Sequence, residues 1–339
     1  MALIKARQWG SAQALAEAVL ACDRSAIARA LTLIDDRRDV ARVPARDLLG
    51  SLGRLGNHLH AHVVGITGPP GAGKSTLSAG LIRHWRELEK RVAVVAVDPS
   101  SPKAGGALLG DRLRMHDACI DDHVFIRSLS DRGTFGGLAP QVLPMVSVLA
   151  PAFDVVLVET VGVGQREVDI ASMADTTCLV LHPDAGDAVQ MLKAGIMEIP
   201  DLVVINKSDL GDSARRAKHE LTTALAHHAH LGVLSVSAVM NSGVSELTQH
   251  VSVHREGLIE RDELVPRRTQ AENSWLLQQC QRAFGDFGVK QLGGARNVAE
   301  FAPDAGSILD RFDQLQTAFY SNLGGARTHL PKKLSSTQH

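Results

Sequence analysis

Residues 62–76 read HVVGITGPPGAGKST, and this stretch decides the fold. It opens with a β-branched apolar run, continues with the pattern GxxxxGKS from Gly68 to Ser75, and leads into residues with helical spacing. A strand, a glycine-rich turn and a helix in this order are the context that a phosphate-binding loop requires. The glycines let consecutive backbone N–H groups face a phosphate, and the helix N-terminus adds its positive dipole end. The stretch therefore predicts a nucleotide site.

Short β-branched runs alternate with spacers of helical length between about residues 62 and 240. Because the runs are apolar throughout, we expect strands of a mostly parallel sheet with helices on both faces. The fold class is therefore α/β, a P-loop domain with a mostly parallel central sheet. The expected strands are 62–67, 91–97, 123–128, 153–159, 176–181, 202–206 and 232–237.

Helical patterns flank this domain on both sides. Apolar residues between about 10 and 55 recur at helical spacing and predict two or three amphipathic helices. Beyond about residue 245 the pattern favours helices, and from about Ser321 the polar sequence predicts a disordered tail. We expect an N-terminal helical extension (1–57), a P-loop domain (58–250), a C-terminal helical region (251–322) and a tail (323–339).

Composition and charge argue against several classes of protein. The 339-residue chain carries 36 basic and 37 acidic residues, so its net charge gives no electrostatic attraction to nucleic acid or an anionic membrane. The four cysteines form no CxxC pair, which argues against a disulfide framework or a zinc site. The N-terminus lacks an apolar signal region, and the apolar runs are too short to span a bilayer. We expect a soluble, cytoplasmic protein.

The phosphate-binding loop predicts roles for its own residues. Lys74 would bring a point charge to the β and γ phosphates, and the Ser75 hydroxyl would bind Mg²⁺. The loop residues expected to bind nucleotide are Gly68, Gly71, Ala72, Gly73, Lys74, Ser75 and Thr76.

Acidic residues at strand ends are the candidate metal ligands. Asp98 and Glu159 each end an expected strand, where carboxylates from neighbouring strands can meet beside the phosphate-binding loop on a hydrated Mg²⁺. Asp111 follows a glycine-rich stretch and is a third candidate. Any one of these acids taken alone could equally be a strand-end or turn residue. Gly162 could donate its N–H to the γ-phosphate, so residues 160–165 would order with the triphosphate and relax after hydrolysis.

Two further stretches indicate the base. Asn206-Lys207-Ser208-Asp209 follows an expected strand, and the Asp209 carboxylate can accept hydrogen bonds from N1–H and the exocyclic amine of guanine, a donor pair that adenine does not offer. Ser237 and Ala238 resemble the second guanine-contacting loop of GTPases, although Val239 replaces the usual lysine. Guanine specificity is the prediction.

Longer stretches resemble the MeaB/ArgK family of P-loop GTPases, over roughly residues 25–280. They are AIARALTLIDD (26–36), DPSSPKAGGALLGDRLRM (98–115), RGTFGGL (132–138), ETVGVGQREVD (159–169), DAGDAVQMLKAGIMEIPDLVVINKSD (184–209) and RRTQAENSWL (267–276). The resemblance implies a homodimer, joined by its C-terminal helices, that binds GTP with Mg²⁺. It also implies a chaperone that helps load, protect or reactivate an adenosylcobalamin-dependent acyl-CoA mutase, methylmalonyl-CoA mutase by default. A cobalamin adenosyltransferase is a further candidate partner.

The same resemblance assigns site residues. Guanine recognition falls to Asn206, Lys207 and Asp209, and metal binding to Ser75, Asp98, Asp111 and Glu159. The residues expected to serve hydrolysis are Lys74, Asp111, Glu159 and Gly162. The chain departs from the family pattern at Ala188, where an acidic residue is common, and its sequence after about residue 285 does not align.

Many GTPases place a glutamine directly after the glycine that senses the γ-phosphate, and it orients the attacking water. Here Val163 follows Gly162. We therefore predict slow intrinsic turnover that rises when a partner orders these segments, with Gln165 or an arginine such as Arg132 contributing.

Three other functions fit parts of the sequence. A small-molecule kinase could use the same phosphate-binding loop, but would use ATP. A nickel-delivery GTPase would need a Cys/His metal site, for which the chain offers only His58, His60 and His62, without cysteine partners. A scaffold could hold GTP as a structural ligand.

Overall fold

The computed structural model describes residues 10–98, 121–130, 139–160, 170–183, 200–225, 231–301 and 306–326. Contacts divide the chain into two compact units, Met1–Ala271 and Glu272–His339. Within the described ranges, no helix combines the length and the apolarity that crossing a bilayer requires.

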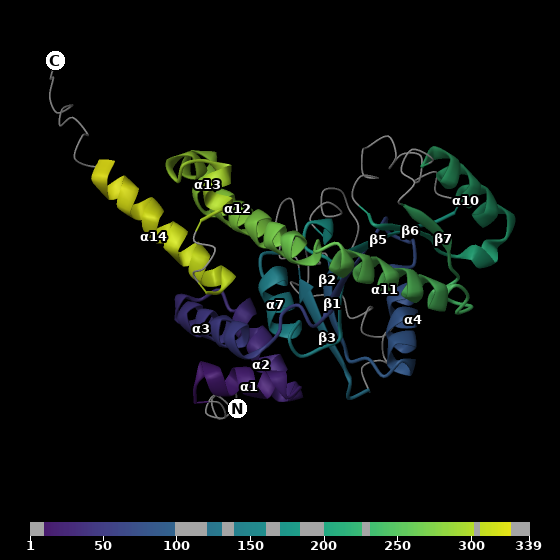
Figure 1. Cartoon of the computed structure of the whole chain (residues 1–339), viewed down its shortest axis with the longest axis horizontal. Coiled ribbons are helices and arrows are strands. Elements are labelled where there is room, and N and C mark those ends of the chain that lie inside the picture. The colour runs from purple at the N-terminus through teal and green to yellow at the C-terminus, as the bar shows by residue number, and fades with distance from the viewer. Residues whose placement is uncertain are drawn as a thin grey trace, which may run out of the picture. The chain divides into compact units, whose positions relative to one another are not determined.

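The first unit is built on a seven-stranded sheet (Figure 1), in the order β3-β2-β4-β1-β5-β6-β7. All the pairings between neighbouring strands are parallel. The strands are β1 (His62–Thr67), β2 (Val92–Asp98), β3 (Val124–Ser130), β4 (Val155–Thr160), β5 (Thr176–Leu181), β6 (Leu202–Ile205) and β7 (Gly232–Ser235). The predicted parallel α/β sheet is confirmed, because runs that are apolar on both faces need helices on both sides.

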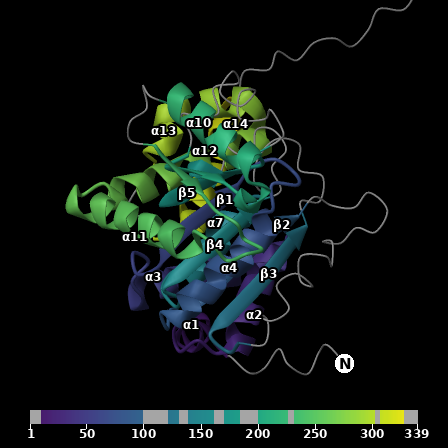
Figure 2. The ribbon, with the colours of Figure 1, turned by 90° about the vertical axis from the view of Figure 1, so that its right-hand side faces the viewer.

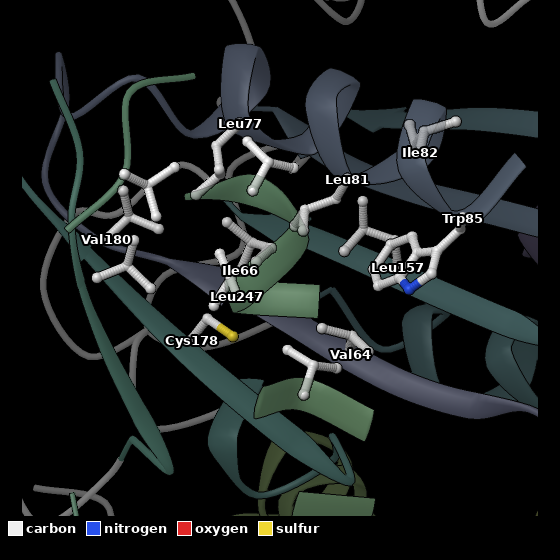
Figure 3. Close-up of a cluster of buried hydrophobic side chains, with 14 of the residues drawn as sticks. Val64, Ile66, Leu77, Leu81, Ile82, Trp85, Leu157, Cys178, Val180 and Leu247 are labelled. Atoms are coloured by element: carbon white, nitrogen blue, oxygen red, sulfur yellow. The ribbon is translucent and has the colours of Figure 1, made fainter. Parts of the chain in front are cut away.

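Helices α4 (Lys74–Glu87) and α11 (Val244–Glu260) cover one face of the sheet. Alternate strand residues such as Val64, Ile66 and Leu157 point into this layer, where they meet Leu81 and Leu247. Figure 3 shows this cluster, with the two helices over the strands. Burial of these side chains supplies much of the stability of the unit, about 1.5–3 kcal/mol for each large apolar side chain.

The opposite face is covered by α10 (Asp212–Ala224), which packs on β5 and β6 through Ala217 and Leu221. Helix α7 (Val142–Leu149) contacts β2. Gly65 of β1 lets residues 170–174 approach this strand, because a Cβ on Gly65 would lie 2.9 Å from Ile170 Cγ1 and 3.1 Å from Ala174 Cβ.

Three N-terminal helices, α1 (Ala12–Leu20), α2 (Arg24–Asp35) and α3 (Asp39–Leu55), match the expected helical extension. Helix α2 lies beside the edge strand β3 (Figure 2). The Arg24 guanidinium donates to the carbonyl oxygen of Val124 at 2.8 Å, and Asp35 pairs with Arg127 at 3.4 Å. These two contacts attach α2 to the edge strand β3.

Helix α12 (Leu264–Gln291) begins in the first unit, and its residues from Glu272 belong to the second unit with α13 (Ala295–Ala299) and α14 (Ile308–Ala326). Gly285 has φ 65° and ψ −176°, which kinks α12. In the second unit the Trp275 ring packs edge-on against Phe312 at 6.0 Å, and Phe284 stacks on Phe319 at 4.2 Å.

The expected tail begins too early. Helix α14 runs to Ala326, so the expectation of disorder from Ser321 is wrong for 321–326. The preceding turns are already fixed by packing of Leu315 and Phe319, and Asn322 Nδ2 donates to the carbonyl oxygen of Gln291 at 3.4 Å. Adding residues to an existing helix requires no new nucleation, which offsets the poor propensity of two glycines.

Candidate functional site

The phosphate-binding loop joins β1 to α4 and depends on two glycines for its shape. Gly68 has φ +141°, and a Cβ there would lie 2.0 Å from the carbonyl oxygen of Val180 in β5. Gly73 has φ +84°, and a Cβ there would lie 2.5 Å from Asn206 Nδ2. Both positions combine a backbone that disfavours L side chains with close approach of another segment. A side chain at either position would therefore displace a neighbouring segment, and the shape of the loop requires glycine there.

Lys74 is the first residue of α4, and its side chain is buried in the loop. Its ammonium group donates to the carbonyl oxygens of Gly68 at 2.7 Å and Pro69 at 2.9 Å. These contacts hold a positive charge at the helix N-terminus, where the helix dipole also favours an anion. The Lys74 ammonium group thus lies in the loop where a phosphate group is predicted to bind.

Ser75 and Glu159 are brought together from positions 84 residues apart. Ser75 Oγ donates to Glu159 Oε1 at 2.6 Å. Glu159 is buried near the end of β4, in register with Ile66 of β1 and Ala96 of β2. A hydroxyl and a carboxylate beside a phosphate-binding loop are the hard oxygen donors that Mg²⁺ prefers. The donor set fits this ion.

The other predicted metal and switch residues are less fully described. Strand β2 ends at Asp98 and neighbours β4, so the backbone of Asp98 lies at the same edge of the sheet as Glu159. Asp111 and Gly162 lie outside the described residues. Their assigned roles stay predictions.

Asn206 joins the two halves of the site. Its Nδ2 donates to the carbonyl oxygens of Ala72 at 2.9 Å and Gly73 at 3.3 Å, and its Oδ1 accepts from the backbone N–H of Ala238 at 3.1 Å. The buried amide thus ties the phosphate-binding loop to both predicted base-contacting loops. The geometry favours positioning of these loops over direct contact with the base.

Asp209 lies in the single-turn helix η3 (Ser208–Leu210) and is exposed. Its Oδ1 accepts from Ser237 Oγ at 2.5 Å, and that hydroxyl accepts from the N–H of Met240 at 3.2 Å. Lys207 precedes it with φ +58°, a left-handed conformation that turns the chain sharply after β6. Ser237 therefore orients the carboxylate predicted to read guanine.

Sequence reasoning missed two contributors to this site. The carbonyl oxygen of Val180 fits under Gly68, and the hydroxyl groups of Thr67 and Thr160 lie 3.4 Å apart at the ends of β1 and β4. A signal existed only for the threonines, because Thr67 ends one of the strands predicted to be parallel and Thr160 directly follows another. Contact of Val180 depends on β5 lying next to β1, which no local pattern indicates.

Two of the three histidines that a nickel site would need, His60 and His62, have other side-chain partners. His62 Nε2 lies 2.8 Å from Thr176 Oγ1, and His60 Nε2 lies 3.1 Å from Asp154 Oδ1. Burial lowers the pKa of His62 to about 3, so the ring is neutral at physiological pH. In the part of the chain that the structure describes, no group of three or more His, Cys, Asp or Glu residues could hold a metal ion.

Comparison with known proteins gives consistent results. The model of the family described as methylmalonyl Co-A mutase-associated GTPase MeaB matches residues 27–287. A relative from Pyrococcus abyssi that is named as a GTPase is 46% identical over 255 residues, covering 73% of this chain and 76% of that protein. The GTPase ArgK of Escherichia coli is 35% identical over 276 residues, covering 76% of this chain and 80% of its own.

A solved structure gives the same result for the architecture. The crystal structure of a protein described as LAO/AO transport system kinase superimposes with a TM-score of 0.66 at 25% identity. The superposition covers 93% of this chain and 97% of that one.

Proposed function

This chain belongs to the family of methylmalonyl-CoA mutase-associated GTPases, MeaB, and we propose that its hydrolysis of GTP assists an adenosylcobalamin-dependent acyl-CoA mutase. As a member of this family the protein is a P-loop GTPase that binds GTP and GDP with Mg²⁺. The proposed role is to assist the mutase in cofactor loading, protection or reactivation, and methylmalonyl-CoA mutase is the first candidate partner to test. The family's own description supports this partner.

One observation carries the assignment of the nucleotide site. Asn206 bonds to Ala72, Gly73 and Ala238, so a single buried side chain fixes the distance between the phosphate-binding loop and the base-contacting loops. Buried amides of this kind are costly to leave unpaired, which makes the arrangement specific. The exposed Asp209 carboxylate, held by Ser237, then serves as the acceptor for guanine.

We assign the triphosphate to the loop Gly68–Thr76, with the Lys74 ammonium on the β and γ phosphates. Ser75 and Glu159 would hold Mg²⁺, joined by Asp98 and Asp111. When bound, this ion neutralises charge on the β and γ phosphates. The residues of the chain supply positioning and electrostatic stabilisation, and no covalent intermediate with the protein is required.

Hydrolysis is an in-line attack by water. The water oxygen bonds to the γ-phosphorus as the bond to the β–γ bridging oxygen breaks, and the products are GDP and inorganic phosphate. Gly162 is the proposed backbone sensor of the γ-phosphate. Because Val163 occupies the place of a water-orienting glutamine, we propose slow turnover of the isolated protein and stimulation by its partner, with Gln165 or Arg132 completing the site.

We also propose a homodimer joined through residues 251–322. Within the second unit, the aromatic side chains of Phe287 and Tyr320 are each 62% exposed. Large exposed aromatic residues are enriched at protein interfaces, where they supply much of the binding energy. Sedimentation analysis of the full chain would give a mass of one protomer if this proposal is wrong.

The deciding experiment measures GTP hydrolysis with and without candidate cobalamin-dependent mutases, and with a cobalamin adenosyltransferase. Stimulation of at least tenfold by one mutase and not by others would identify the client. Turnover of tens per second without any partner would contradict the proposed dependence. Nucleotide-independent binding to the mutase would favour a scaffold that holds GTP as a structural ligand.

A kinase role remains the second candidate because the matched solved structure is described as a kinase. A kinase would bind ATP and transfer its phosphate to a small molecule. Competition between GTP and ATP for the purified protein separates the two functions, since the Asp209 site favours only guanine.

A further inference from the structure

The stretch RRTQAENSWL (267–276) has no part in the nucleotide site, and its first two residues are the arginines of the first turn of α12. Each side chain forms a bidentate pair with a carboxylate whose residue directly precedes a strand of the sheet. These contacts lie at the opposite ends of the strands from the phosphate-binding loop.

Arg268 forms a bidentate pair with Asp175. Its Nε donates to Asp175 Oδ1 at 2.9 Å, and its Nη2 donates to Oδ2 at 2.6 Å and to the carbonyl oxygen of Ala61 at 2.6 Å. The Asp175 side chain is 1% exposed, and its Oδ2 also accepts from the N–H of Val63 at 2.8 Å. The pair therefore joins α12 to the beginnings of both β1 and β5.

Arg267 forms a second bidentate pair with Asp201. Its Nη1 and Nη2 donate to Oδ1 at 3.1 Å and Oδ2 at 2.6 Å, and its Nε donates to the carbonyl oxygen of Ala174 at 3.0 Å. Asp201 Oδ2 also accepts from the N–H of Thr177 at 2.8 Å. Forked pairs fix both distance and orientation, so α12 cannot shift without the two acids.

The strands that follow these acids lead to the nucleotide site. Strand β5 carries Val180, whose carbonyl oxygen lies under Gly68 of the phosphate-binding loop. Strand β6 spans four residues after Asp201 and ends directly before Asn206, which bonds to that loop. Hydrogen-bonded strands in a sheet are stiff, so a displacement at one end reaches the other.

We propose that Arg267 and Arg268 are positioning residues that couple the nucleotide site to helix α12. Nucleotide contacts that shift the ends of β5 and β6 would move Asp175 and Asp201, and with them the first turn of α12. By linkage, the position of α12 would alter GTP affinity to the same extent. Trp275 lies two turns beyond Arg268 on the same helix and serves as the reporter for this movement.

A 19F spectrum tests this directly, because the chain has only three tryptophans, Trp9, Trp85 and Trp275. In 5-fluorotryptophan-labelled full-length protein, with resonances assigned by Trp275→Phe, we expect the Trp275 signal to differ between GDP and a non-hydrolysable GTP analogue. The double variant Arg267→Lys/Arg268→Lys keeps both charges but loses the forks. We expect it to bind nucleotide and to lose at least half of that chemical-shift difference.

Arg255 provides the matched control. It is a neighbouring arginine, on α11, and its Nη2 donates to the carbonyl oxygens of Leu59 at 2.8 Å and His60 at 2.7 Å. Arg255→Lys should leave the difference at Trp275 unchanged. An unchanged difference in the double lysine variant would overturn the proposal, since it would show that positive charge alone is enough at these two positions. An equal loss in Arg255→Lys would also overturn it, since the effect would then not be specific to Arg267 and Arg268.

Hydrogen exchange on the unmodified chain keeps the proposal testable if the double variant fails to fold. Amides of 264–271 should exchange several-fold more slowly with the GTP analogue than with GDP. Equal exchange in the two states would contradict coupling.

Discussion

Asn206 and its neighbours show how single residues assemble the nucleotide site. The amide of Asn206 satisfies carbonyls of the phosphate-binding loop on one side and an N–H of the second base-contacting loop on the other. Ser237 in turn holds Asp209. Each of these residues acts through a neighbour, so substitutions here should separate positioning from direct recognition.

Asp209→Asn should exchange guanine specificity for xanthine specificity. The asparagine amide presents an NH2 donor group and one carbonyl acceptor where guanine needs two acceptors, while xanthine presents a carbonyl in place of the exocyclic amine. A lost hydrogen bond to a charged group costs about 1.5–3 kcal/mol, or roughly a tenfold to hundredfold loss of GTP affinity. Competition binding with GTP and xanthosine triphosphate measures both effects. Unchanged preference for GTP would remove Asp209 from the base site.

Gly73→Ala should weaken nucleotide binding more than Gly71→Ala. Both glycines have positive φ, at +84° and +80°, so alanine strains either backbone by about 1–2 kcal/mol. Only at Gly73 would the new Cβ also meet another segment, at 2.5 Å from Asn206 Nδ2, whereas at Gly71 nothing lies within 4 Å. Calorimetric titration of the two variants with GDP isolates the contribution of that contact. Equal affinities of the two variants would show that the Asn206 side chain moves away from the new Cβ at no cost to binding.

At the scale of elements, the carboxyl ends of the strands form the nucleotide site, and the amino ends attach helices to the sheet. The carboxyl ends of β1, β4 and β6 lead into the residues of the nucleotide site, as expected at the crevice of a parallel sheet. The amino ends of β1, β5 and β6 carry a polar network in which Thr176 Oγ1 lies 2.8 Å from both His62 Nε2 and His254 Nδ1. That network fixes helices α11 and α12 to the sheet.

His62 should make folding sensitive to mild acid. Burial lowers its pKa to about 3 from the ordinary 6.5, so below pH 6.5 the unfolded chain binds a proton that the folded protein excludes. The free energy of unfolding therefore keeps its full contribution from His62 above pH 6.5. That contribution decreases as the pH drops toward 3, by up to about 1.4 kcal/mol per pH unit.

His62→Gln keeps a donor for Thr176 and removes the titration. Urea denaturation between pH 7 and 5, above the range where carboxylates titrate, should show a flatter pH dependence for this variant. A slope equal to that of the unmodified protein would assign the acid sensitivity to other groups.

At the scale of the whole molecule, the chain consists of two compact units. The first unit, Met1–Ala271, contains the sheet, the N-terminal helices and every described residue of the nucleotide site. The second unit, Glu272–His339, has its own aromatic cluster and a buried arginine, Arg311, that donates to Asn273 at 2.9 Å. Binding and proposed association are thus assigned to different units.

A chain ended at Ala271 should bind GTP and lose the proposed association. Its core is complete within the first unit, so we expect affinity within about a hundredfold of the full chain, the usual size of coupling between sites. Light scattering should give the mass of a single protomer. A dimeric fragment would move the interface into the first unit, and failure to bind GTP would show that the second unit completes the site.

The sequence by itself determined the fold class, the phosphate-binding loop and the family, because these follow from local patterns. A strand, glycines and a helix start at fixed spacing are needed wherever a backbone cradles a phosphate. The apolar runs likewise placed β1 and β5 with the bounds that the structure shows, since a strand buried on both faces is apolar along its whole length.

Only the tertiary structure decided which residues meet across the sheet. Val180 fits under Gly68, and Arg268 pairs with Asp175, through strand order and helix placement that no local pattern specifies. The contacts of Asn206 depend on packing for the same reason, because Ala72 and Gly73 lie more than 130 residues earlier in the chain and Ala238 lies 32 residues later. Local chemistry fixes what a segment can bind, and packing fixes where it binds.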